Sequence, residues 1–137
     1  NQIVFVEPGP DSLQNGYDEA VANGLHHVHL EAGIHTVTAY DDEGAEMPYV
    51  KIEQPMTISG AGATKTFVES GGFQIKGVKG EHCTFVDMTL RKTKDHGFGG
   101  INGMSFTARK MIIEECGGSG IFAVGTNGTL DDCQVKQ

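Results

Sequence analysis

Residues 88–110 read MTLRKTKDHGFGGINGMSFTARK and residues 111–132 read MIIEECGGSGIFAVGTNGTLDD, so the apolar pattern repeats after 22–23 residues. A fixed period of this length is typical of a solenoid, in which each repeat buries its core only by stacking on its neighbours. Five apolar columns share the period: Ile75, Phe98 and Ile121; Val78, Ile101 and Val124; Met88, Met111 and Cys133; Leu90, Ile113 and Val135; and Phe85, Ala108 and Leu130.

Three short strands fit into each repeat. Met88 and Leu90 point inward on one strand, Gly97–Gly99 forms a second strand around Phe98, and Ser105–Ala108 forms the third. Glycine and charged residues fill the corners, and the pattern shows no helix after the N-terminal segment. The sequence therefore predicts an all-β fold, a right-handed parallel β-helix of about four coils.

The N-terminal segment predicts a short strand at residues 3–6 and a helix that ends before Gly24. Asp11 or Ser12 is expected to cap this helix, in a capping-box arrangement with a polar residue in its first turn. The helix has a single apolar stripe, formed by Leu13, Tyr17, Ala20 and Val21. Such a one-sided helix can cover the open end of the first coil.

We interpret residues 1–137 as a single domain. Residues 1–24 hold the first strand and the capping helix, residues 25–72 form irregular first coils, and residues 73–137 form the regular coils. The chain ends soon after the core position Val135 without a cap. We therefore expect either a fragment of a longer chain or end-to-end self-association through the C-terminal coil.

Three segments resemble the pectin-lyase-like right-handed β-helix superfamily. They are residues 31–35 (EAGIH) after the helix and strand, residues 56–62 (MTISGAG) followed by Thr66, and the repeated coils that end at Val135. Ala32 and His35 depart from the Pro and Tyr of the family's opening segment. The resemblance implies the fold. For an enzyme of this superfamily it implies a polysaccharide lyase with acid-bound calcium and an Arg or Lys base, or a hydrolase with several Asp residues on adjacent coils.

Composition narrows the classes of partner. The net charge of −8 argues against a nucleic-acid partner and an anionic membrane surface, because both need clustered Lys and Arg. No apolar run approaches the roughly 20 residues that span a bilayer. The compartment is not determined by the sequence, although the three cysteines, an odd number without metal-like spacing, favour an intracellular location.

Charged residues fall into columns of alternating sign. Arg91, Glu114 and Lys136 form one column, and Asp87, Lys110 and Asp132 form another. Residues one coil apart lie about 4.8 Å apart, so alternation of sign stabilises a solenoid surface. We interpret both columns as structural ladders. A third column, a predicted hydroxyl ladder, consists of Thr84, Thr107 and Thr129.

The same columns contain the candidate site residues. The catalytic candidates are Asp87, Arg109, Lys110 and Asp132, of which the two acids, about 10 Å apart, approach the separation of an inverting pair. The ligand-binding candidates are Arg91, Glu114 and His96. The candidates for a metal site are Asp41, Asp42 and Glu43 in an acidic loop, whose oxygens suit calcium. No other cofactor is expected.

The histidines near the N-terminus offer a weaker metal hypothesis. Alternation along a strand places His27 and His29 on one face and His26 on the other. Scattered strand histidines explain the pattern better than a two- or three-histidine metal site does.

The leading functional hypothesis is a non-catalytic β-solenoid module that presents a flat ladder surface to a carbohydrate or protein partner. The alternative is the N-terminal part of a carbohydrate-active enzyme, pectate-lyase-like or a glycoside hydrolase, acting on an acidic polysaccharide. A third hypothesis is a purely structural, self-assembling unit.

Overall fold

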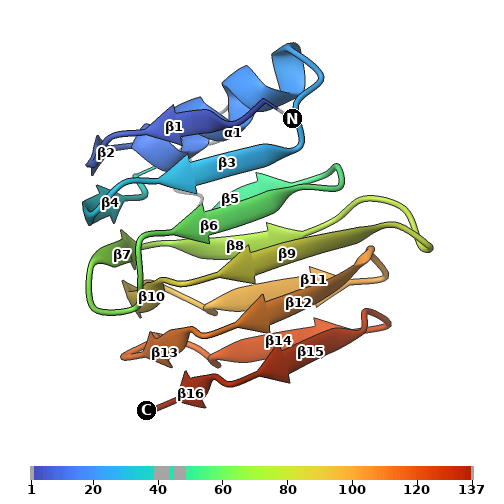
Figure 1. Cartoon of the computed structure of the whole chain (residues 1–137). Helices are drawn as coiled ribbons and strands as arrows, with labels where there is room; N and C mark the ends of the chain where they lie inside the picture. The colour runs from blue at the N-terminus through green and yellow to red at the C-terminus, as the bar shows by residue number, and fades with distance from the viewer. Residues whose placement is uncertain (1, 39–43, 45–48, 137) are drawn as a thin grey trace.

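The computed structural model describes residues 2–38, 44 and 49–136, and shows a parallel β-solenoid of about five turns (Figure 1). Each complete coil contributes one strand to each of three sheets. The first sheet contains β1 (Val4–Val6), β3 (His27–Leu30), β6 (Thr57–Gly60), β9 (His82–Val86), β12 (Ser105–Arg109) and β15 (Gly128–Asp131). The second sheet contains β2 (Gly9–Pro10), β4 (Gly33–Thr36), β7 (Thr66–Ser70), β10 (Thr89–Thr93), β13 (Ile112–Glu114) and β16 (Gln134–Val135). The third sheet contains β5 (Tyr49–Ile52), β8 (Gly72–Ile75), β11 (Phe98–Ile101) and β14 (Ile121–Val124).

The register of the first sheet explains why the repeat is visible only in the second half of the sequence. One column runs through His27, Thr57, Thr84, Thr107 and Thr129, which are 30, 27, 23 and 22 residues apart in turn. From β3 onward, the step thus shortens along the chain to 22–23 residues. The predicted hydroxyl ladder is confirmed and extends by one further threonine into β6. Met56 and Thr57 therefore belong to a coil with longer loops.

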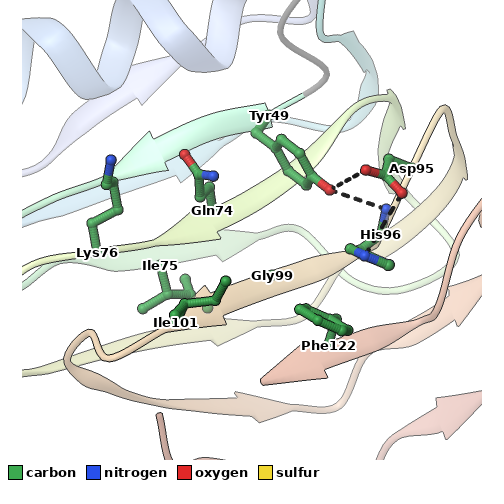
Figure 2. Close-up of a pocket in the computed structure, with 10 residues that line it drawn as sticks. Tyr49, Gln74, Ile75, Lys76, Asp95, His96, Gly99, Ile101 and Phe122 are labelled. Carbon is green, nitrogen blue, oxygen red and sulfur yellow. Dashed lines mark hydrogen bonds and ion pairs between the residues drawn. The ribbon is translucent and has the colours of Figure 1, made fainter. Parts of the chain in front are cut away.

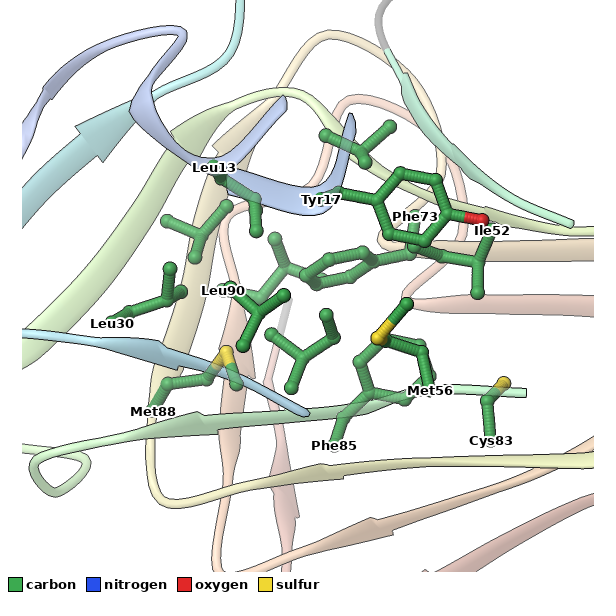
Figure 3. Close-up of a cluster of buried hydrophobic side chains, with 14 of the residues drawn as sticks. Leu13, Tyr17, Leu30, Ile52, Met56, Phe73, Cys83, Phe85, Met88 and Leu90 are labelled. Atoms are coloured by element: carbon green, nitrogen blue, oxygen red, sulfur yellow. The ribbon is translucent and has the colours of Figure 1, made fainter. Parts of the chain in front are cut away.

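The core is a stack of apolar side chains enclosed by the three sheets (Figure 3). Four phenylalanines form its centre, with ring centroids 4.6 Å apart for Phe73 and Phe85 and 5.2 Å apart for Phe98 and Phe106. Phe85 joins the two pairs, because its ring lies 4.9 Å from that of Phe98. Offset and edge-on aromatic pairs of this kind add about 0.5–1.5 kcal/mol each beyond the burial of their area.

The predicted helix is present as α1 (Ser12–Ala22) and packs its apolar stripe against the first coil. Gly24 ends it with a positive φ of 67°, as expected. The predicted capping box is wrong. Asp11 makes no side-chain cap and instead accepts a hydrogen bond from the backbone N–H of Thr38, while the Ser12 hydroxyl donates to the carbonyl of Gly9. These two side chains tie the helix to the neighbouring coil rather than cap it.

Three apolar columns are confirmed in register, including those of Leu90 and Phe85. Two columns need correction. Phe98 stacks on Phe73, not on Ile75, because this coil is two residues longer than its successor. Ile101 and Val124 do pair, but they point outward and are 62% and 51% exposed, whereas Val78, the third residue of that predicted column, lies beyond the end of β8 and is 66% exposed. Ile101 and Val124 therefore belong to the outer surface of the third sheet.

Smaller differences concern counts and ends. The solenoid makes about five turns, one more than expected, because the first two strands and the last two strands form partial coils. The strand that starts at Gly33 ends at Thr36 rather than Thr38. Cys133 is partly buried rather than enclosed, whereas Met88 and Met111 of its column are buried. In the described part of the chain, no helix has the length and apolar character that a membrane crossing requires.

Candidate functional site: a groove on the third sheet

A groove of about 420 Å³ lies on the outer face of the third sheet (Figure 2). It forms because the outward position of β11 is Gly99, which stands in register between Gln74 of β8 and Phe122 of β14. The missing side chain leaves a hollow between larger neighbours. The groove is lined by Tyr49, Gln74, Ile75, Lys76, Asp95, His96, Gly99, Gly100, Ile101 and Phe122.

Tyr49 and Asp95 form the polar wall of the groove. The Tyr49 hydroxyl donates to Oδ2 of Asp95 at 2.8 Å and accepts from the backbone N–H of His96 at 3.3 Å. Burial, and next the hydrogen bond to the Asp95 carboxylate, raise the pKa of Tyr49 to about 12. The phenol therefore keeps its proton at neutral pH and holds the Asp95 loop against β5.

His96 and Phe122 form the aromatic wall. Their rings are parallel within 5°, with centroids 4.6 Å apart. Nδ1 of His96 accepts a hydrogen bond of 2.9 Å from the backbone N–H of Ser119, so a neutral ring carries its proton on Nε2, which lies 3.7 Å from Oδ1 of Asp95. The stacking and these two contacts fix the imidazole plane at the edge of the groove. His96 and Ser119 are 23 residues apart, which is one repeat.

Gln74 lines the groove and carries an unsatisfied polar atom. Its Oε1 is buried, and no hydrogen-bond donor reaches it from the described residues. Figure 2 shows the amide beside Lys76, on the opposite side of the Gly99 hollow from Asp95. A buried carbonyl oxygen without a donor is unfavourable.

The four catalytic candidates do come together, although in a depression separate from the groove on the third sheet. Asp87, Arg109, Lys110 and Asp132 line a depression of about 250 Å³ at the corner between the first and second sheets, with Val86 and Asp131. The corner residues have positive φ angles of 62° at Asp87, 52° at Lys110 and 54° at Asp132. Among the described residues no ion pair joins these side chains. The expected ladder of salt bridges is therefore absent there, although the residues do stack at equivalent corners of successive coils.

The ligand-binding candidates are separated. Only His96 lies in the groove, whereas Arg91 and Glu114 are register partners on the second sheet. Arg91 donates from Nε to Oε2 of Glu69 at 2.7 Å and covers the Phe67 ring at 4.0 Å. It pairs with a residue of the preceding coil and not with Glu114. These contacts give Arg91 a structural role.

The proposed calcium ligands Asp41, Asp42 and Glu43 lie outside the described residues. Elsewhere in the described ranges no group of three or more His, Cys, Asp or Glu side chains could hold a metal ion. The corner depression does not suit calcium either, because Arg109 and Lys110 lie among its carboxylates.

Sequence reasoning missed Tyr49, Gln74, Asp95 and Phe122. The signal that could have revealed them is the glycine at the outward position of β11, flanked in register by larger residues. That signal depends on the correct register, and the constant 23-residue step aligned Phe98 with Ile75 instead of Phe73.

A comparison of the chain with models of protein families, with curated proteins and with solved structures finds no significant match. The structure therefore supports the parallel β-solenoid architecture that the resemblance implies, and not membership of the pectin-lyase-like superfamily itself. The function has to be argued from the residues of the groove.

Proposed function

We propose that the protein is a β-solenoid binding module whose groove on the third sheet holds part of a carbohydrate chain. The observation that carries this proposal is the hollow at Gly99, which has the stacked rings of His96 and Phe122 as one wall and Gln74 and Asp95 among its lining residues. Sugars present both chemistries that such a groove needs. Their apolar C–H faces pack on aromatic rings, and their hydroxyls form hydrogen bonds with polar side chains that line the groove.

The remaining lining residues fit the same ligand. Asp95 offers a carboxylate as acceptor, and Lys76 offers a cationic donor at the other side of the hollow. Ile101 and Val124 extend the apolar surface beyond Phe122 along β11 and β14. Tyr49 and His96 are held by contacts within the protein. We therefore propose that the groove binds its ligand without catalysing a reaction.

Isothermal titration with neutral and acidic oligosaccharides tests the proposal. Binding should be lost or weakened about tenfold, equivalent to about 1.4 kcal/mol, in Phe122→Ala and Gln74→Leu. Thr107→Ala, on the first sheet, is the control and should bind like the parent protein. Absence of binding by the parent across the panel, with folding verified by circular dichroism, would refute the carbohydrate assignment and favour a protein partner.

A second candidate function rests on the convergence of Asp87, Arg109, Lys110 and Asp132 in one depression. Two carboxylates in register on alternate coils, about 10 Å apart, approach the spacing of an inverting glycoside hydrolase. Release of reducing ends from acidic polysaccharides measures this activity, and Asp87→Asn and Asp132→Asn should each abolish it. Equal rates in parent and variants would exclude this reading.

A further inference from the structure

Ser59 lies between two histidine rings on the outer face of the first sheet, outside the groove described above. Its Oγ is 2.8 Å from Nε2 of His27 and 2.8 Å from Nδ1 of His29. His27 and His29 are two residues apart on β3, so their side chains lie on the same face of the sheet. Ser59 is in register with His29 on the adjacent strand β6 (Figure 1). The sheet register therefore fixes all three side chains together.

A carboxylate lies close to one of these histidines. Oε1 of Glu31 lies 3.6 Å from Nε2 of His29. The proton of a neutral His29 is therefore assigned to Nε2, facing Glu31, which leaves Nδ1 to accept the hydrogen bond from the Ser59 hydroxyl. The Ser59 oxygen then accepts from Nε2–H of His27. A nucleophile bonded to a base, with the base oriented by a third group, is the arrangement of covalent acyl transfer.

We propose that Ser59 is the nucleophile of an ester-cleaving site, with His29 as its base, Glu31 as a positioning residue and His27 as the donor to the developing oxyanion. The expected substrates are esters of small acyl groups. The exposed Phe5 ring, 5.8 Å from the His29 ring, provides an apolar contact for the acyl or alcohol part.

The reaction balances without any further co-reactant. Ser59 Oγ attacks the acyl carbon while its proton passes to Nδ1 of His29, and Nε2–H of His27 stabilises the oxyanion. The tetrahedral intermediate expels the alcohol, which takes the proton from His29. Water, deprotonated by His29, then attacks the acyl-serine and releases the carboxylic acid, which restores the Ser59 hydroxyl.

The charge state of His27 supports its role as a neutral donor. Burial, and next the neighbouring His29, lower the pKa of His27 below its ordinary value. A neutral imidazole at this position can give one N–H to the oxyanion and does not repel a positive charge that develops on His29.

The chain provides a matched control on the same face. Nδ1 of His82 lies 2.6 Å from Oγ of Ser105, and its Nε2 lies 2.9 Å from Oγ1 of Thr107. Both ring nitrogens are bonded to hydroxyls, so this serine–histidine pair lacks an orienting carboxylate. It has the same register as His29 and Ser59, a histidine opposite a serine on adjacent strands of the first sheet, and it is more exposed than that pair, but it should not be reactive.

The experiment is labelling with a fluorophosphonate, located by peptide mass spectrometry, together with hydrolysis of p-nitrophenyl acetate. We expect the label on Ser59 and not on Ser105. Hydrolysis should fall about 100-fold in Ser59→Ala and His29→Gln and stay unchanged in Ser105→Ala. Glu31→Gln should lower kcat with little change in KM, and should shift the pH profile of kcat.

Circular dichroism and thermal melting of each variant separate loss of chemistry from loss of fold. The proposal is overturned if folded parent protein takes no label, if Ser105 is labelled as readily as Ser59, or if Ser59→Ala hydrolyses the ester at the parent rate. The proposal goes beyond carbohydrate binding, and the two fail separately because Phe122→Ala should leave labelling of Ser59 intact.

Discussion

Replacement of Gly99 by alanine tests the register on which the groove depends. A Cβ at this position would meet only Cε1 of Tyr49, at 3.8 Å, which is ordinary van der Waals contact. Glycine in a strand interior costs about 0.5–1 kcal/mol relative to alanine, because it loses more backbone entropy on folding. We therefore expect Gly99→Ala to raise the free energy of unfolding by about 0.5 kcal/mol and the Tm by about 2 °C.

Gly72 of β8, in the same sheet, is the matched control. A Cβ there would lie 2.1 Å from the carbonyl oxygen of Gly97 and 2.4 Å from that of His96, both of them backbone atoms that cannot rotate away. We expect Gly72→Ala to lower the free energy of unfolding by about 3 kcal/mol or more, since the strands must separate to admit the methyl group.

Thermal and urea unfolding followed by circular dichroism measures both variants. Equal destabilisation of Gly99→Ala and Gly72→Ala would refute the register that turns Gly99 outward, and with it the groove. Gly99→Leu extends the test to function, because the longer side chain fills the hollow. It should melt near the parent Tm and lose carbohydrate binding, whereas retained binding would place the ligand elsewhere.

Three further outcomes are expected. Burial lowers the pKa of His35 from its ordinary 6.5. The stability due to the neutral ring is therefore fully present above about pH 6.5 and is lost as the pH falls below that value. The Tm should drop as the pH is lowered from 6.5, and it should drop less in His35→Gln. Burial raises the pKa of Cys83 to about 12, so iodoacetamide at pH 8 should modify Cys116 before Cys83, and equal rates would contradict the burial. Leu130 and Val135 are 43% and 45% exposed on the last coil, so light scattering of a polypeptide of residues 1–137 should show concentration-dependent self-association that Leu130→Lys reduces, and strictly monomeric behaviour of that polypeptide would count against it.

Much of the fold follows from the sequence because stacking repeats one side-chain environment at a fixed step. Leu90, Ile113 and Val135 must match because each covers the next in the core. The same reasoning failed for Ile101 and Val124, which share the period but face solvent. Periodicity reports that two residues are stacked, and it does not report which face of the strand carries them.

The candidate site was less accessible to sequence reasoning for a related reason. Its polar residues come from corners whose lengths differ between coils. Asp95 and His96 precede β11, at a step where register partners are 25 residues apart for Phe73 and Phe98 and then 23 for Phe98 and Ile121. Two extra residues keep the alternation of inward and outward side chains and lengthen only the corner. A search for a constant period therefore does not detect this loop.

The irregular coils are therefore where recognition and chemistry are most readily accommodated. In the regular coils, a side chain at an outward position has a similar residue above and below it, as in the threonine column, and its hydrogen bonds can be satisfied along the ladder. Where coil length changes, neighbours differ in kind: Gln74 is followed by Gly99, and Ser59 by Val86. Val86 has no polar group to take the place of His27 and His29, so the Ser59 hydroxyl stays with the histidines, and Gly99 leaves a hollow beside Gln74. The breaks in the repeat thus account for both proposed sites, since a ladder of like residues would have closed each of them.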